Sequence, residues 1–153
     1  MAQNCGGTLV GDSHIITAAH CTDGVHPDNI TVLIGETTLG VANDKTAFIG
    51  NVSEIIQHSK YNRTTKQNDI AVLVLSSPVD LFTYPNIKPA CLPITESRAD
   101  MFGRDAVVSG WGRMVEGGPG HSHLQEVMVK ILPHCGNYKG KIPNLQLYLR
   151  YHN

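Results

Sequence analysis

Two side chains in this sequence have types and surroundings suited to proton-transfer chemistry. His20 follows the largely apolar segment 15–19 and is next to Cys21. Asp69 directly precedes the apolar run 70–75, where an unpaired carboxylate would be costly to bury and would need a partner such as an imidazole. A histidine can take the proton of a nucleophile while a buried carboxylate holds its ring in the required tautomer. His20 and Asp69 are therefore candidates for a general base and its orienting partner, although their spacing alone proves no pairing.

Short runs rich in β-branched residues, separated by Gly, Pro, Asn and Asp, must position these side chains. Their regular spacing predicts an all-β barrel or sandwich. No segment shows a long apolar repeat of 3.6 residues, so we expect helix only in a turn around residues 18–21. The predicted strands are residues 7–10, 14–18, 30–35, 52–57, 70–75, 105–110 and 124–132.

A proline-rich segment divides the chain. Residues 81–96 carry Pro85, Pro89 and Pro93, which predicts an extended surface linker and a domain boundary near residue 95. We therefore expect a first domain over residues 1–95 and the start of a second over residues 96–135. The tail, residues 136–153, has only a weak apolar pattern and receives no structural assignment.

Composition and cysteine content limit the functional classes. The 153 residues include 12 basic and 13 acidic side chains, a formal net charge of −1, which argues against binding nucleic acid or an anionic membrane. Four cysteines and three Asn-x-Ser/Thr sites, at Asn29, Asn51 and Asn62, indicate an oxidising compartment and a secreted glycoprotein. Residues 1–4 have neither the basic start nor the apolar segment of a signal peptide, so we expect the secreted precursor to begin earlier.

Several ordered blocks together indicate a family. Residues 5–10 (Cys-Gly-Gly-Thr-Leu-Val), 15–21, 55–62, 68–75, 89–93 (Pro-Ala-Cys-Leu-Pro) and 108–112 (Val-Ser-Gly-Trp-Gly) resemble the chymotrypsin/trypsin-like serine endopeptidases, peptidase family S1. The resemblance covers roughly residues 4–135. It implies two antiparallel six-stranded β-barrels with catalysis at their interface. The first barrel would lack its first strand here, and the second would be truncated.

The resemblance also assigns roles to the candidate residues. It implies that His20 is the base, that Asp69 orients it, and that Cys5 bonds to Cys21 beside the base. It further implies that the partners of Cys91 and Cys135 lie outside this chain. By sequence alone, four cysteines still allow three pairings.

The nucleophile that this family uses is not found in the sequence. Its serine lies in a Gly-Asp-Ser-Gly-Gly motif that is absent here. Ser13 follows Gly11-Asp12, but this segment precedes the base and is predicted to be an ordinary turn. Ser109 and Ser122 also lack the family's context. Because the oxyanion hole and the specificity pocket are built from later residues in this family, we expect the chain alone to be inactive.

Three functional hypotheses remain open. The first is a serine endopeptidase, incomplete as given, with protein or peptide substrates, protein inhibitors, and no cofactor or metal ion. The second is a catalytically inactive secreted homologue that acts by binding protein. The third, from another class, is a metal site formed by His121, His123 and His134, since neutral imidazoles are common ligands.

Overall fold

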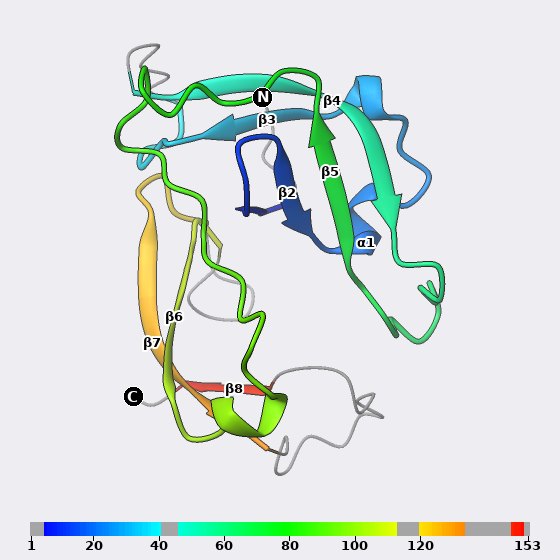
Figure 1. The fold of residues 1–153 in the computed structure, drawn as a ribbon, viewed down its shortest axis with the longest axis vertical. Coiled ribbons are helices and arrows are strands. Elements are labelled where there is room, and N and C mark those ends of the chain that lie inside the picture. Colours follow the sequence, from blue (N-terminus) through cyan, green and yellow to red (C-terminus); the bar gives the residue numbers. More distant parts are fainter. Residues whose placement is uncertain (1–4, 41–45, 113–119, 134–147, 152–153) are drawn as a thin grey trace. The chain divides into compact units, whose positions relative to one another are not determined.

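The computed structural model describes residues 5–40, 46–112, 120–133 and 148–151. The chain forms two compact units, Met1–Leu92 and Pro93–Asn153. Eight of the eleven described elements are β-strands and the other three are single short helical turns (Figure 1), which confirms the all-β class. Cys135, His134 and residues 136–147 of the tail lie outside the described residues.

The first unit is a curled, five-stranded antiparallel sheet in the order β1-β2-β5-β4-β3 (Figure 1), with α1 and the 3-10 helix η1 between β2 and β3. This curled half-barrel, with a second sheet in the other unit, confirms the chymotrypsin-like β-barrel class implied by the resemblance. The elements are β1 (Thr8–Leu9), β2 (His14–Thr17), α1 (Ala19–Thr22), η1 (Pro27–Asn29), β3 (Thr31–Ile34), β4 (Phe48–Gln57) and β5 (Ala71–Leu75).

The curl of the sheet depends on β4, which changes partner along its length. Residues 48–51 pair with β3, whereas residues from Val52 onward pair with β5. The register shifts between Val52 and Glu54, and such an irregularity bends a strand and increases its local twist. Only residues 52–57 were predicted to be strand, so the sequence pattern missed the first part of β4.

The core follows from the period-two alternation of strand side chains. In β5, Ala71, Leu73 and Leu75 are buried while the residues between them are only half-buried. Leu73 and Leu75 pack in one apolar cluster with side chains from β1, β2, β4 and the segment after β5. The buried members of this cluster are Leu9, Ile15, Val52, Leu73, Leu75, Val79 and Ile87.

Much of the segment after β5 packs against the sheet of the first unit, to which it belongs. Val79 and Ile87 are buried, and the ring of Tyr84 meets that of Phe48 edge-on with centroids 5.9 Å apart. The Ala90 N–H donates to the Leu9 carbonyl over 2.8 Å. Residues 84–90 of the predicted linker are therefore fixed to the sheet by apolar packing and a hydrogen bond. The prolines of this segment did not indicate these contacts.

The second unit is a three-stranded antiparallel sheet in the order β6-β7-β8. Its elements are the 3-10 helix η2 (Arg98–Met101) and the strands β6 (Asp105–Gly110), β7 (Gln125–Leu132) and β8 (Tyr148–Tyr151). The Lys130 ammonium bonds to the Asp105 carboxylate across β6 and β7 over 2.7 Å. The sequence pattern assigned no strand to the tail, where β8 pairs with the end of β7. No helix among the described residues is long and apolar enough to cross a membrane.

Candidate active site

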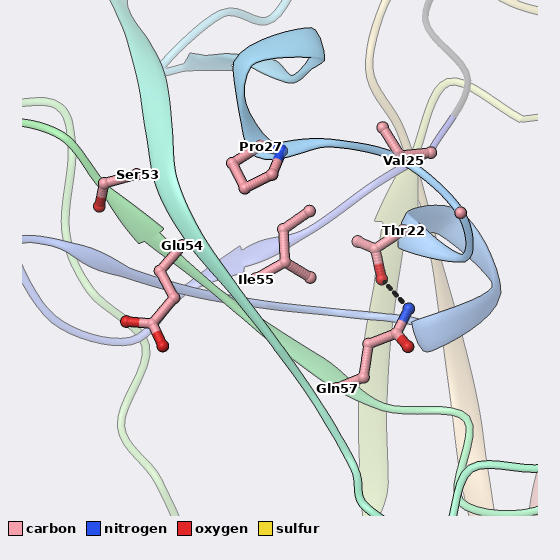
Figure 2. A pocket seen from close by; sticks show the side chains of 8 residues that line it. Thr22, Val25, Pro27, Ser53, Glu54, Ile55 and Gln57 are labelled. Carbon is pink, nitrogen blue, oxygen red and sulfur yellow. Dashed lines mark hydrogen bonds between the residues drawn. The ribbon is translucent and has the colours of Figure 1, made fainter.

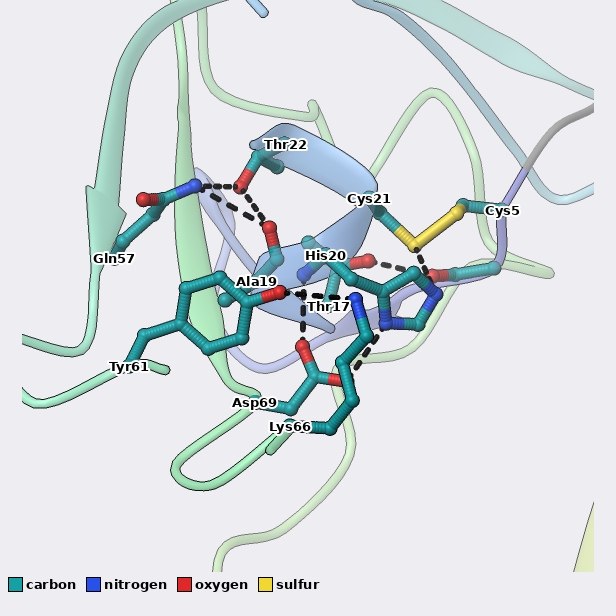
Figure 3. A network of polar contacts seen from close by, with 11 residues as sticks. Cys5, Thr17, Ala19, His20, Cys21, Thr22, Gln57, Tyr61, Lys66 and Asp69 are labelled. Atoms are coloured by element: carbon teal, nitrogen blue, oxygen red, sulfur yellow. Dashed lines mark hydrogen bonds and ion pairs between the residues drawn. A yellow bond between two sulfur atoms is a disulfide. The ribbon is translucent and has the colours of Figure 1, made fainter. Parts of the chain in front are cut away.

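His20 lies on α1, a single helical turn that follows β2 directly. Ala18 is extended (φ −80°, ψ 140°) and Ala19 is fully buried, so the turn is anchored by its first residue. The Thr22 hydroxyl donates to the Ala19 carbonyl over 3.0 Å, and the Gln57 side chain at the end of β4 donates to the Thr22 hydroxyl over 2.8 Å (Figure 3). These bonds attach the turn that carries His20 to the central sheet.

A shallow pocket of about 410 Å³ lies between β4 and the segment that follows α1. Figure 2 shows the Thr22–Gln57 hydrogen bond beside it. Its lining residues are Thr22, Gly24, Val25, Pro27, Ser53, Glu54, Ile55 and Gln57. His20 and Asp69 are not among these, so the pocket is separate from the candidate catalytic pair.

The other side of His20 is held by a disulfide. Cys21 is bonded to Cys5, with 6.1 Å between the Cα atoms, as the resemblance implied. The Thr17 hydroxyl donates to the Gly6 carbonyl over 2.8 Å, which holds the segment after Cys5 against the end of β2. Closing a loop of 16 residues stabilises the fold by about 3 kcal/mol in the chain-entropy model. The backbone beside His20 is therefore restrained covalently as well as by hydrogen bonds.

Asp69 is presented by a turn that enters β5. Asn68 adopts the left-handed conformation (φ 53°), which Asn tolerates better than most residues. Its side-chain amide donates to the Lys60 carbonyl over 2.8 Å, and the Ile70 N–H donates to the Asn68 carbonyl over 2.8 Å. The Asn-Asp dipeptide therefore positions the Asp69 carboxylate just before the first residue of β5.

The structure brings His20 and Asp69 together although 49 positions separate them. Asp69 Oδ2 is 2.7 Å from His20 Nδ1, and Asp69 Oδ1 accepts the backbone N–H of His20 over 2.7 Å (Figure 3). An ionised carboxylate can only accept, so Nδ1 carries the proton and Nε2 retains its lone pair. The Asp69 side chain is 18% exposed and that of His20 49%. The pair thus offers a solvent-accessible basic nitrogen whose tautomer is set by a mostly buried carboxylate.

Opposing effects act on the pKa of Asp69. Partial burial by itself would raise it. The hydrogen bonds from the ring and backbone of His20, together with the charges of His20 and Lys66, outweigh burial and lower the pKa below its ordinary value. Asp69 is therefore ionised at neutral pH, as an orienting carboxylate must be.

This lowered pKa predicts an acid-sensitive contribution to stability. Since the folded protein holds the proton of Asp69 less tightly than the unfolded chain, the contribution is fully present above the unfolded pKa of about 4 and is lost as pH falls through the folded pKa. Asp69→Asn should lower the free energy of unfolding by about 1 to 3 kcal/mol at neutral pH, and by less below about pH 3. Urea unfolding of both proteins across this range measures the difference. If the difference in unfolding free energy between the two proteins stayed constant with pH, the lowered pKa of Asp69 would be contradicted.

The serines that sequence analysis considered lie in other local arrangements. The Ser13 hydroxyl donates to Asp12 Oδ1 over 2.8 Å and lies 3.2 Å from His14 Nδ1. The carboxylate there accepts the hydrogen bond of the serine hydroxyl and does not orient the imidazole, so the order of a catalytic relay is not reproduced. Ser122 likewise lies 3.2 Å from the ring of its neighbour His123, and Ser109 is on β6.

The proposed histidine metal site is not formed by the described residues. Among them, one group of three ligand side chains is close enough to hold an ion, namely Cys5, His20 and Cys21. His121 and His123 are not part of it, and His134 lies outside the described residues. Cys91, the remaining described cysteine, is exposed and unbonded.

The three glycosylation sites all lie at the surface. Asn29 ends η1, Asn51 is on β4 and Asn62 begins the turn before Asp69, and each side chain is exposed. Asn62 Oδ1 accepts the N–H groups of Thr64 and Thr65 over 2.9 Å. Its side chain therefore supports the loop that leads to Asp69.

Sequence reasoning missed three residues that support the pair: Thr22, Gln57 and Lys66. Thr22 and Gln57 anchor α1, while Lys66 contributes a positive charge near Asp69 and donates to the Tyr61 hydroxyl over 3.5 Å (Figure 3). A polar residue at the end of a strand and a lysine in a turn are common patterns. No local signal could have identified either.

Comparison with known proteins identifies the family. The trypsin family model matches residues 1–151. The chain belongs to the trypsin family. This match extends past residue 135, where the recognisable motifs end, and includes β8. The similarity to the trypsin family therefore extends over almost the whole length of this chain.

Curated members of this family show the same likeness. The chain is 41% identical to Serine protease filzig of Drosophila melanogaster over 130 residues, which are 85% of this chain and 7% of that protein. It is 34% identical to Trypsin eta of the same organism over 131 residues, 86% of this chain and 48% of that protein. It is 34% identical to human Trypsin-3 over 144 residues, 92% and 44% respectively. The chain spans less than half the length of each of these relatives.

Proposed function

We propose that His20 and Asp69 are the general base and the orienting carboxylate of a serine endopeptidase that hydrolyses peptide bonds in protein substrates. The observation that carries this proposal is the pair of 2.7 Å contacts from the two Asp69 oxygens to the ring and the backbone of His20. If His20 merely packed behind the disulfide, there would be no reason for both carboxylate oxygens of Asp69 to contact it. Family membership supports the same assignment.

In this mechanism Nε2 of His20 takes the proton of a serine hydroxyl as that oxygen attacks the substrate carbonyl. The imidazolium that forms is stabilised by the adjacent Asp69 carboxylate, which keeps its charge throughout. The same Nε2 proton then passes to the leaving amine, and an acyl-enzyme remains for water to hydrolyse. The half-exposed ring can reach both partners while its Nδ1 stays bonded to Asp69.

We propose secretion as the setting for this activity. The disulfide beside His20 and three exposed Asn-x-Ser/Thr sites suit an oxidising, glycosylating pathway. Protein substrates and protein inhibitors are the partners that such an enzyme would meet.

The proposal is tested by adding a nucleophilic serine to the chain. A polypeptide in which the present sequence is followed by a trypsin-family segment bearing Gly-Asp-Ser-Gly-Gly should hydrolyse peptide amides and be labelled by a serine-directed phosphonate. The 153-residue polypeptide should do neither, because that motif is not in its sequence. Hydrolysis by the 153-residue polypeptide would overturn the second expectation. A folded, nucleophile-bearing form that remained inactive would favour the protein-binding homologue.

A further inference from the structure

The disulfide and the ring of His20 form one cluster of potential metal ligands. Cys21 Sγ lies 3.6 Å from His20 Nε2, and the two sulfurs and the ring nitrogen all lie within 4.8 Å of one another (Figure 3). Cys5 and His20 are exposed and Cys21 is half-buried, so ions and reductants can reach the group from solvent. The bonded sulfurs are poor ligands, whereas two thiolates at the same place would be strong ones.

One spacing in this cluster, from Cys21 Sγ to His20 Nε2, matches a tetrahedral zinc site. With bonds of about 2.3 Å to sulfur and 2.05 Å to nitrogen, a tetrahedral ion separates a thiolate from an imidazole nitrogen by about 3.6 Å. The Nε2–Sγ distance to Cys21 already has this value. The two sulfurs would have to separate to about 3.8 Å. An added Cβ on Gly6, next to Cys5, would meet none of the described atoms within 4 Å, so that side of the backbone is open.

Contacts other than the disulfide keep Cys5 near the ring after reduction. The Thr17 hydroxyl bonds to the Gly6 carbonyl, and Thr8 pairs with Ile16 in the β1–β2 ladder. These contacts do not involve sulfur, so they persist when the bond between Cys5 and Cys21 is broken.

The histidine is already oriented as a metal ligand. Metal-binding histidines commonly donate their other ring N–H to a carboxylate, which fixes the tautomer and strengthens the ligand. Asp69 Oδ2 accepts this bond from Nδ1 over 2.7 Å and leaves the Nε2 lone pair on the side of Cys21. The ring therefore already has the tautomer that binds an ion through Nε2.

We propose that reduction converts Cys5, Cys21 and His20 into a site for Zn²⁺ with a fourth position open to water. A phosphine and one water reduce the disulfide, yielding the phosphine oxide and two thiols. Zn²⁺ then binds both sulfurs as thiolates and releases their two protons. An ion on Nε2 occupies the lone pair that accepts the serine proton, so binding also silences the base; this last consequence rests on the proposed function.

Cobalt(II) binding to the reduced 153-residue chain tests the site directly. The background protein carries Cys91→Ser and Cys135→Ser, which removes the other thiols. After phosphine reduction it should bind one Co²⁺ with tetrahedral visible bands and thiolate charge-transfer absorption, and one equivalent of Zn²⁺ should abolish both. The oxidised background protein should show neither signal.

Variants separate this site from simple thiol binding. In the background protein, His20→Ala should weaken cobalt binding by at least about tenfold and shift the visible bands, and Asp69→Asn should weaken it by about 10- to 100-fold. His14→Ala, which removes another imidazole, should change neither. Absence of the tetrahedral spectrum, an unchanged spectrum in denaturant, or insensitivity to His20→Ala would each overturn the proposal. None of these readouts requires hydrolysis, so they stand apart from the test of the proposed function.

Discussion

Asp69→Asn is expected to lower kcat by about 10⁴-fold in a nucleophile-bearing form of this protein, the magnitude established for the triad of this family. The reason lies in how the two oxygens are used. The backbone N–H of His20 can only donate, so the amide oxygen of the substituted side chain must stay on it. The amide nitrogen then faces Nδ1, which must become the acceptor. The imidazole proton moves to Nε2, and the lone pair that receives the serine proton is lost.

The measurement is kcat for a peptide amide, normalised to titrated active sites. Asp80→Asn is the matched control, because that carboxylate also accepts hydrogen bonds, from Phe82 and Thr83, but does not contact His20. It should leave kcat unchanged. His20→Ala should lower kcat more than Asp69→Asn does, and the two together should cost little more than His20→Ala alone, since they act as a unit. A loss of less than about tenfold in Asp69→Asn would refute its role as the orienting carboxylate.

Leu73→Ala should destabilise the first unit by about 3 to 4 kcal/mol, a large part of the stability of a small domain. Leu73 is 5% exposed in the middle of β5, where it pairs with Ile15 on one side and Ile55 on the other. Removing its side chain leaves a cavity that strands hydrogen-bonded on both edges cannot easily close. Because β5 begins two residues after Asp69, the contact between His20 and Asp69 should lose order as well.

Chemical unfolding compares this variant with Leu33→Ala, the same change on the edge strand β3. Leu33 is 43% exposed, so its truncation should cost less than about 1 kcal/mol. Equal losses in the two variants would show that burial in the β5 cluster is not what holds this sheet together. Fluorescence or circular dichroism in urea gives both midpoints.

Local patterns in the chain were enough to predict most of the elements. Short runs rich in β-branched residues mark β2, β5 and β6, and the ordered motifs around His20 and Asp69 mark the family and the candidate pair. These features depend on neighbours in the chain, because side-chain alternation and turn propensities act over a few residues. A candidate chemistry, a histidine base with a carboxylate partner, could therefore be put forward before any fold was known.

Contacts between residues distant in the chain could not be predicted from these local patterns. Which Asp69 oxygen meets which donor of His20, the anchoring of α1 by Gln57, the change of partner along β4 and the pairing of β8 all join residues distant in the chain. No local signal specifies them, because each depends on how the sheet curls and on which buried side chains share its core. The placement of two sulfurs within 4.8 Å of the basic nitrogen, and with it the inferred zinc site, arises only when the folded sheet carries α1 to Asp69.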